Sequence, residues 1–132
     1  KNISICDWAP SAFEILHQKF PNFPQNRCLV NDFFQSEGTY DLILEQTFFC
    51  ALNPGLRNDY VNKVFDLLKP GGKIAGLLFA SHFAKPGPPF GGEAEEYRKL
   101  FERKLRLKNL AIAENSIGPR AGNELFFVAV KQ

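Results

Sequence analysis

The chain is expected to fold as an α/β domain in which the strands of a mostly parallel sheet alternate with helices. Short apolar runs of strand length alternate along it with segments whose apolar residues recur at helical spacing, and short turns join them. Its 132 residues, 45% of them hydrophobic, have the size of one domain with its own core. We therefore expect helices on both faces of the sheet and a late antiparallel strand.

The first third of the chain predicts a strand, a helix and a second strand. Residues 2–6 alternate loosely between apolar and polar and predict the first strand. Ser11 and Glu14 have the spacing of a capping box that begins a helix, and Pro21 ends this helix. Residues 27–30 predict the next strand, which we expect to be buried and parallel to the first.

The middle of the chain repeats this alternation. Residues 40–44 predict another buried parallel strand. Asn53, followed by Pro54, begins a helix as a cap and first turn, and its apolar residues recur at helical spacing until the turn at 70–72. A strand at residues 73–79 follows, and a loop rich in proline and glycine comes after it.

The last third predicts a charged helix and two strands. Four apolar residues form one stripe on this helix: Tyr97, Leu100, Phe101 and Leu105. Residues 107–114 and 124–130 are the expected strands, and the last can close the sheet in antiparallel orientation.

Composition excludes several classes of function. Sixteen basic and fourteen acidic residues leave a net charge of +2, without a basic stripe, so we expect no nucleic-acid partner. No apolar run approaches the roughly 20 residues of a membrane helix, so we expect no membrane partner. Three cysteines, an odd number without close pairing, favour a reducing, cytoplasmic location. His17, His82 and the other possible ligands lack the spacing of a metal site.

Polar residues follow the expected strands at their carboxyl ends, where open parallel sheets bind ligands. Asp7 can accept hydrogen bonds from the ribose hydroxyls of a nucleoside, or it is a solvated turn aspartate. Asp32 with Phe33 can hold an adenine ring, or they are a turn residue and a core residue. Gln46, beside Glu45, is the third expected cofactor contact.

A second group of residues is expected to contact the substrate. Phe48 can roof the pocket or belong to the core, and Pro89 with Phe90 forms a stiff wall or a rigid surface turn. Arg120 can attract an anionic nucleophile or carboxylate, or it is solvated or paired with Glu124. No residue is assigned as catalytic.

Four stretches in this order, residues 40–50, 51–54, 67–72 and 87–90, resemble the thiopurine S-methyltransferase and thiol/halide methyltransferase family. The resemblance runs from about Asp7 to Glu124. It implies a class I methyltransferase (Rossmann-like) fold and the cofactor S-adenosyl-L-methionine. It also implies that Asp7 binds the ribose, that Asp32 and Phe33 bind the adenine, and that Gln46 lies near the methionine end. Trp8, next to Asp7, completes the expected cofactor-binding set.

The chain departs from the family in one respect: the glycine-rich loop and first strand, with the N-terminal segment that covers the active site, are not seen. Residues 1–132 are therefore expected to form a single partial domain with a gap between the strands at 2–6 and 40–44, inactive alone. A polypeptide extended upstream is expected to bind the cofactor, and this chain is not. Equal affinities by calorimetry would contradict this.

The implied reaction is in-line transfer of the sulfonium methyl to a small soft nucleophile such as a thiol, a thiopurine-like compound or a halide. Such a nucleophile needs little help from a base, so alignment and exclusion of water carry the catalysis. Three alternatives stay open: an oxygen or nitrogen acceptor, a methyltransferase-like binding domain without turnover, and a nicotinamide-dependent dehydrogenase. We expect a monomer that takes a small-molecule substrate.

Overall fold

The computed structural model describes residues 2–132 and divides into two compact units, one ending at Glu37 and one beginning at Gly38. Each unit has a sheet of its own, and each is described by itself. The expectation of a single domain stays a prediction.

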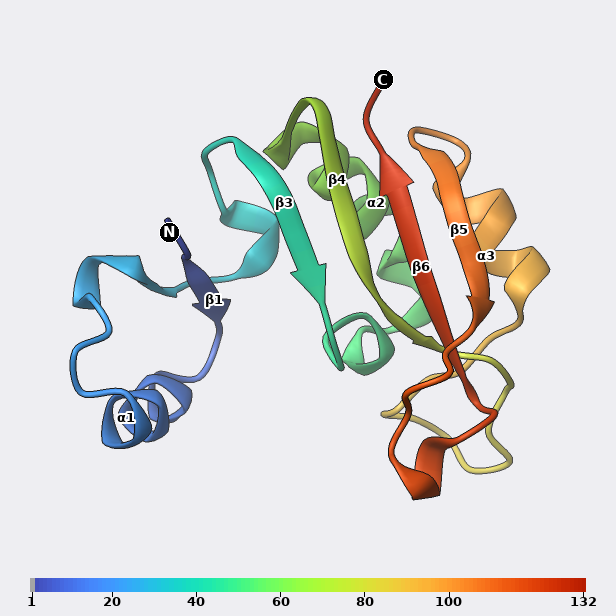
Figure 1. The fold of residues 1–132 in the computed structure, drawn as a ribbon, viewed down its shortest axis with the longest axis horizontal. Coiled ribbons are helices and arrows are strands. Elements are labelled where there is room, and N and C mark those ends of the chain that lie inside the picture. The colour runs from blue at the N-terminus through green and yellow to red at the C-terminus, as the bar shows by residue number, and fades with distance from the viewer. Residues whose placement is uncertain (1) are drawn as a thin grey trace. The chain divides into compact units, whose positions relative to one another are not determined.

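The first unit is a strand, a helix and a second strand. Strands β1 (Ile5–Asp7) and β2 (Cys28–Val30) pair in parallel, as the sequence predicted, and helix α1 (Pro10–Lys19) connects them (Figure 1). Neither strand is fully buried, and Val30 is 52% exposed, so the prediction that the second strand is buried was wrong.

The predicted capping box of α1 was also wrong. The helix begins at Pro10, which places Ser11 inside the first turn, and its N-cap is Ala9, without a side-chain hydrogen bond. Proline suits the first helical position because its fixed φ is already helical and it has no N–H to satisfy.

His17 ties the end of α1 to the following loop. Its two ring nitrogens lie 2.9 Å from the carbonyl oxygen of Phe13 and 3.0 Å from that of Phe23. The histidine is therefore a structural residue of the first unit.

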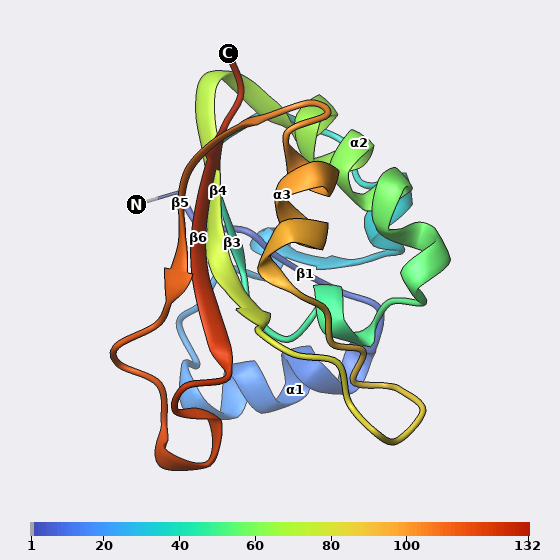
Figure 2. The ribbon, with the colours of Figure 1, turned by 90° about the vertical axis from the view of Figure 1, so that its right-hand side faces the viewer.

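The second unit is a four-stranded sheet with two α-helices on one face (Figures 1 and 2). In order across the sheet, the strands are β3 (Tyr40–Glu45), β4 (Leu68–Phe79), β6 (Glu124–Val130) and β5 (Arg106–Ile112). The helices are α2 (Arg57–Leu67) and α3 (Ala94–Phe101). Strands β3 and β4 are parallel, and β6 is antiparallel to both of its neighbours, so the late antiparallel strand is confirmed.

Both ends of α2 have identifiable causes. Asn53 Oδ1 accepts a hydrogen bond from Gly55 N at 2.9 Å and caps the short 3-10 turn Pro54–Leu56, which leads into the helix as predicted. The chain is already extended at Leu68, so β4 begins there rather than at residue 73. Lys131 Nζ donates to the carbonyl oxygens of Phe65 and Leu68, at 2.7 and 2.8 Å, and so satisfies acceptors at the C-terminus of α2.

The core of the second unit lies between these helices and the sheet. Side chains from both layers are almost completely buried there, among them Phe49, Tyr60, Val64, Ile74, Tyr97, Phe101 and Phe127. Helix α3 starts with a capping box in which Glu93 and Glu96 are the reciprocal partners, and the sequence analysis missed it.

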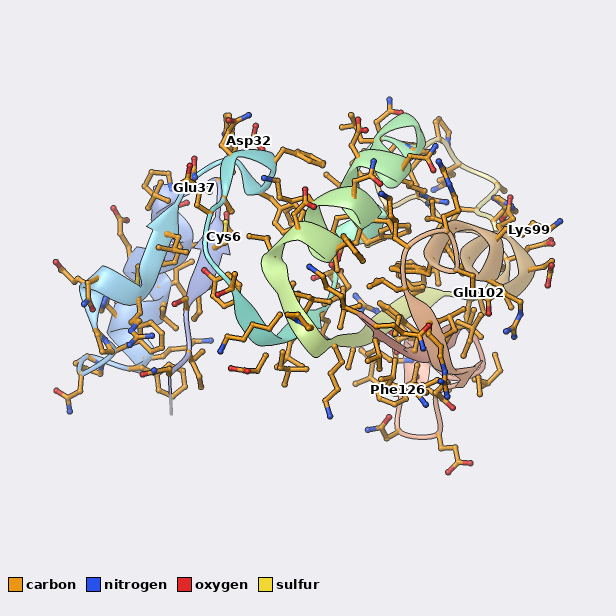
Figure 3. The ribbon with its side chains drawn as sticks, turned by 90° about the horizontal axis from the view of Figure 1, so that it is seen from above. Cys6, Asp32, Glu37, Lys99, Glu102 and Phe126 are labelled. Atoms are coloured by element: carbon orange, nitrogen blue, oxygen red, sulfur yellow. The ribbon has the colours of Figure 1, made fainter. Side chains whose placement is uncertain are left out.

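The opposite face of the sheet carries exposed apolar side chains. Leu42 is 45% exposed, Leu44 is 78% exposed and Phe126 is 43% exposed. Figure 3 shows Phe126 on the side of the sheet away from Lys99 of α3 and from Glu102, which follows this helix. The expected helices on both faces are thus not found within residues 38–132, where both α-helices cover one face. Among residues 2–132, no strand pairs with the second edge of β1 or of β3. The expected gap between these strands stays a prediction.

Candidate functional site

Asp7 and Asp32 lie at the same edge of the small sheet in the first unit. Asp7 ends β1 and pairs in register with Val30, two residues before Asp32, and Asn31 N donates to the Asp7 carbonyl oxygen at 3.1 Å. The parallel pairing places both carboxylates at the carboxyl ends of neighbouring strands, as the sequence predicted.

Each of these carboxylates stabilises its own turn. Asp7 Oδ1 accepts from Ala9 N at 2.8 Å, and Asp32 Oδ1 accepts from Phe34 N at 2.9 Å. Within residues 2–132, no hydrogen bond is made by the second oxygen of either group. The turn-aspartate interpretation therefore holds for one oxygen of each residue, and the other can accept from a ribose hydroxyl or an exocyclic amine.

The aromatic residues expected beside the adenosyl group lie in the same unit. The rings of Phe33 and Phe34 pack edge to face with centroids 5.6 Å apart, and Trp8 is 73% exposed. A nucleoside can be bound by groups of these kinds: the second carboxylate oxygens of Asp7 and Asp32 can accept hydrogen bonds, and the Phe33 ring and the Trp8 indole offer aromatic surfaces. The roles of these residues stay predictions.

In the second unit, Glu45 organises the turn that follows β3. This buried residue accepts hydrogen bonds from Phe48 N at 3.0 Å and Phe49 N at 2.9 Å through Oε1, and from Tyr60 Oη at 2.7 Å through Oε2. Burial raises the pKa of the Glu45 carboxyl, and the three hydrogen bonds act in the opposite direction. The pKa of Tyr60 is raised well above its usual value by burial and by the charge of Glu45.

Glu45 was expected on this rim beside Gln46, without a role of its own. Its hydrogen bonds fix a tight turn in which Thr47 has φ 61°, a value that non-glycine residues rarely adopt. Gln46 is exposed on this turn. A buried carboxylate thus holds the segment that presents Gln46.

A cavity of about 290 Å³ lies within the second unit beside this turn. Three segments far apart in sequence meet there, and the lining residues are Thr47, Cys50, Ala51, Phe79, Pro88, Pro89 and Arg120. Two of the expected substrate residues, Pro89 and Arg120, are therefore brought together. Phe48 and Phe90 do not line the cavity: Phe48 packs towards Tyr60, with centroids 6.2 Å apart, and the ring of Phe90 lies against Gly87.

Arg120 supplies the positive charge of this cavity. Its guanidinium carbon lies 5.6 Å from the centre of the Phe79 ring, and Nη1 lies 3.5 Å from Glu124 Oε2. The ion pair with Glu124 was one of the interpretations of Arg120, and it is present. The arginine side chain is still 35% exposed, so its remaining N–H groups can meet a ligand.

Cys50 is a lining residue that the sequence analysis did not assign. Burial, and after it the negative charge of Glu45, raises the pKa of the Cys50 thiol, which therefore stays protonated at neutral pH. Its only sequence signal is its place in the 40–50 stretch, between Phe49 and Ala51.

The first unit has a larger concavity of about 780 Å³, near Ile3, Phe20 and Arg27. It lies towards the amino ends of β1 and β2, away from Asp7 and Asp32, and contains no predicted site residue. In the part of the chain that the structure describes, no three His, Cys, Asp or Glu side chains could hold a metal ion. No helix of residues 2–132 is long and apolar enough to cross a membrane.

The chain is similar in sequence to known proteins over most of its length. Residues 9–128 match the family model described as thiopurine S-methyltransferase. The chain is 35% identical over 125 residues to a probable thiol methyltransferase 2 of Arabidopsis thaliana, with 89% of this chain and 55% of the relative covered. It is 28% identical to thiocyanate methyltransferase 1 of Brassica oleracea, with the same coverage of both chains. The chain thus spans about half the length of these curated relatives.

Solved structures share the fold at low sequence identity. The N-methyltransferase NodS of Bradyrhizobium japonicum in complex with S-adenosyl-L-homocysteine superposes with a TM-score of 0.74 at 14% identity, over 97% of this chain and 65% of NodS. A TehB-like SAM-dependent methyltransferase of Corynebacterium glutamicum gives a TM-score of 0.69 at 19% identity, over 96% of this chain and 66% of that protein. At these identities the likeness establishes the fold alone, which is that of class I methyltransferases.

Proposed function

The chain belongs to the thiopurine S-methyltransferase family, and from this premise we propose that it is part of an S-adenosyl-L-methionine-dependent methyltransferase that acts on a small soft nucleophile. The observation that carries the proposal is the cavity beside β3 and β4, which combines an apolar lining with the guanidinium of Arg120. Such a cavity suits a thiolate, a thiopurine-like compound or a halide, each of which is polarisable and weakly hydrated.

The proposed cofactor contacts come from the strand ends. Asp7 would accept hydrogen bonds from the ribose through its second carboxylate oxygen, with Trp8 beside it. Asp32 and Phe33 would hold the adenine, and Gln46 would contact the methionine end. Support comes from the shared edge of the two aspartates and from the exposure of Gln46 on its turn.

When bound, S-adenosyl-L-methionine supplies an electrophilic methyl group on a sulfonium sulfur. The acceptor atom would form a bond to that carbon as the bond from carbon to sulfur breaks, with its electron pair left on the sulfur of S-adenosyl-L-homocysteine. A thiol acceptor would lose its proton to solvent. Arg120 would orient the anionic form of the acceptor, and the side chains of Phe79, Pro88 and Pro89 would exclude water. The raised pKa of Cys50 keeps this thiol protonated, so that it does not compete as a nucleophile.

The proposal is tested by methyl transfer from labelled cofactor to a panel of acceptors. The protein to assay is a polypeptide that joins this chain to the glycine-rich segment expected upstream. We expect product with thiols, thiocyanate or iodide, and a loss of about tenfold or more in kcat/KM for Arg120→Met. Methylated product from hydroxyls or amines alone would refute the proposal that the acceptor is a soft nucleophile. Tight cofactor binding without any methylated product would refute the proposal that the protein is an enzyme.

Binding can be tested separately by calorimetry. The extended polypeptide is expected to bind S-adenosyl-L-methionine and this chain alone is not, because the strand expected between β1 and β3 would be supplied only by the extension. We also propose a cytoplasmic monomer. The supporting observation for the location is that Cys6, Cys28 and Cys50 are all free thiols.

A further inference from the structure

Arg57 occupies an unusual place behind the acceptor cavity. It is the first residue of α2, and its guanidinium packs on two aromatic rings of the core, 4.7 Å from the centre of Phe49 and 5.8 Å from that of Tyr97. Its Nε is buried without a hydrogen-bond partner within residues 2–132, and no acidic side chain there forms an ion pair with it.

The partners of Arg57 are backbone carbonyl groups of the proline loop. Nη2 donates to the carbonyl oxygen of Gly91 at 2.8 Å and, more weakly, to that of Phe90 at 3.4 Å. These residues directly follow Pro88 and Pro89, which line the cavity. A half-buried cation packed against two rings, with its hydrogen bonds directed to one loop, holds that loop more firmly than a neutral side chain can.

The same loop is attached to the opposite wall of the cavity. Phe90 N donates to the carbonyl oxygen of Cys50 at 2.7 Å, and Gly92 N donates to that of Ser81 at 3.2 Å. Gly91 has no space for a side chain, because a Cβ there would collide with the Ser81 carbonyl oxygen. Both walls therefore meet at Arg57: its ring partner Phe49 precedes Cys50, and its carbonyl partners follow Pro89.

We propose that Arg57 is a positioning residue that fixes the distance between the Cys50 wall and the Pro88–Pro89 wall of the acceptor cavity. It acts through the carbonyl groups of residues 90 and 91 and through the ring of Phe49, without touching the acceptor. As a determinant of acceptor fit, this role rests on the proposed function. As a clamp on the loop, it can be measured on the chain alone.

The test compares Arg57→Lys with the wild-type chain, and Arg98→Lys is the matched control. Lysine keeps the positive charge near Cys50 but lacks the planar fork and stacks less well on aromatic rings. Arg98 lies on α3, 46% exposed, with Glu95 and Glu102 as its ion-pair partners.

The first readout is the alkylation rate of Cys50 by iodoacetamide, resolved from Cys6 and Cys28 by mass spectrometry. Cys50 is expected to react about fivefold faster in R57K, because the cavity opens, and R98K is expected to match the wild type. The alkylation rate is measured at several pH values to separate two causes. A more open cavity multiplies the rate by the same factor at every pH, whereas an altered pKa of the Cys50 thiol shifts the midpoint of the curve of rate against pH. An unchanged Cys50 rate, or a shifted midpoint alone, would overturn the proposal.

The second readout is amide hydrogen exchange. The amides of Phe90 and Gly92 are expected to exchange about tenfold faster in R57K, with those of β6 unchanged. Equal acceleration in β6 would mean that Arg57 supports the whole unit, and it would overturn the local clamp.

The third readout uses the extended enzyme. R57K is expected to raise KM for the acceptor about fivefold and to leave KM for S-adenosyl-L-methionine within about twofold. A fall in kcat with both KM values unchanged would overturn the role in acceptor fit. If no acceptor is methylated at all, the proposed function fails, while the alkylation and exchange results still decide the clamp.

Discussion

Replacing Tyr60 with phenylalanine should destabilise the second unit more than the same change at Tyr97. Both tyrosines are 1% exposed, and each donates one hydrogen bond from its hydroxyl group. Tyr60 donates to the buried carboxylate of Glu45 at 2.7 Å, whereas Tyr97 donates to the carbonyl oxygen of Phe79 at 2.8 Å. The two substitutions therefore differ mainly in the charge of the acceptor that each leaves unsatisfied.

The magnitudes follow from that charge. A hydrogen bond to an ionised group contributes about 1.5–3 kcal/mol, and one between neutral groups contributes about 1 kcal/mol. Because Glu45 is 5% exposed, water cannot replace the lost donor, so we expect about 2–3 kcal/mol for Y60F. For Y97F we expect a loss of about 1 kcal/mol in the free energy of unfolding.

The assay is urea-induced unfolding followed by far-ultraviolet circular dichroism, with the m-value compared between variants. Equal losses for Y60F and Y97F at about pH 7, or a larger loss for Y97F, would refute the argument that Glu45 is a buried, charged acceptor.

The pH dependence gives a second, independent check. The pKa of Glu45 is raised in the folded state by burial, and the hydrogen bond from Tyr60 lowers it, so Y60F raises this pKa further. Because the pKa of this carboxyl is higher in the folded state, the folded state takes up the proton at a higher pH than the unfolded state does. Protonation of Glu45 therefore raises the free energy of unfolding as the pH falls. The difference between wild type and Y60F should therefore shrink on acidification, by at most about 1.4 kcal/mol per pH unit. A difference independent of pH would contradict this reasoning.

Three further predictions concern the second unit. Phe127→Ala should lower the free energy of unfolding in urea by about 3–5 kcal/mol, because Phe127 is 0% exposed. Phe126→Ala should lower it by about 1 kcal/mol or less, because Phe126 is 43% exposed. Similar losses for the two variants would contradict the assignment of the sheet faces. Lys131→Met should cost about 1–2 kcal/mol in the same assay, because the carbonyl groups at the end of α2 lose their donor, and no loss would show that water replaces it. In an absorbance titration, Tyr97→Phe should leave the phenolate signal below pH 11 unchanged, since burial raises the pKa of Tyr97 to about 12, and a smaller signal would contradict that burial.

The alternation of strands and helices was predictable because its signal is local. Apolar periodicity and turn residues predicted the strand that ends at Val130, and they predicted the helix that follows Asn53. Helix capping was harder to predict, because Ser11 had the right spacing but Pro10 had already started the helix. The capping box that the structure does contain is formed by Glu93 and Glu96 at the start of α3, although glutamate is an uncommon N-cap residue.

The candidate site was predictable in part. Pro89 and Arg120 were expected near a substrate, and they do line one cavity. Cys50 and Phe79 were missed because their place in that cavity depends on three segments folding together, which no local pattern encodes. Two phenylalanines, Phe48 and Phe90, were expected in the pocket, and they pack elsewhere because an aromatic ring suits a core as well as a wall.

The proposed acceptor cavity is lined by residues of the second unit, whereas both aspartates expected to hold the nucleoside belong to the first. Under the proposed function, a lineage could therefore change its methyl acceptor through substitutions at a few positions after Gly38, with Asp7 and Asp32 unaltered. A laboratory selection for new acceptors could be restricted in the same way, to a small library that randomises the cavity and leaves Asp7 and Asp32 in place.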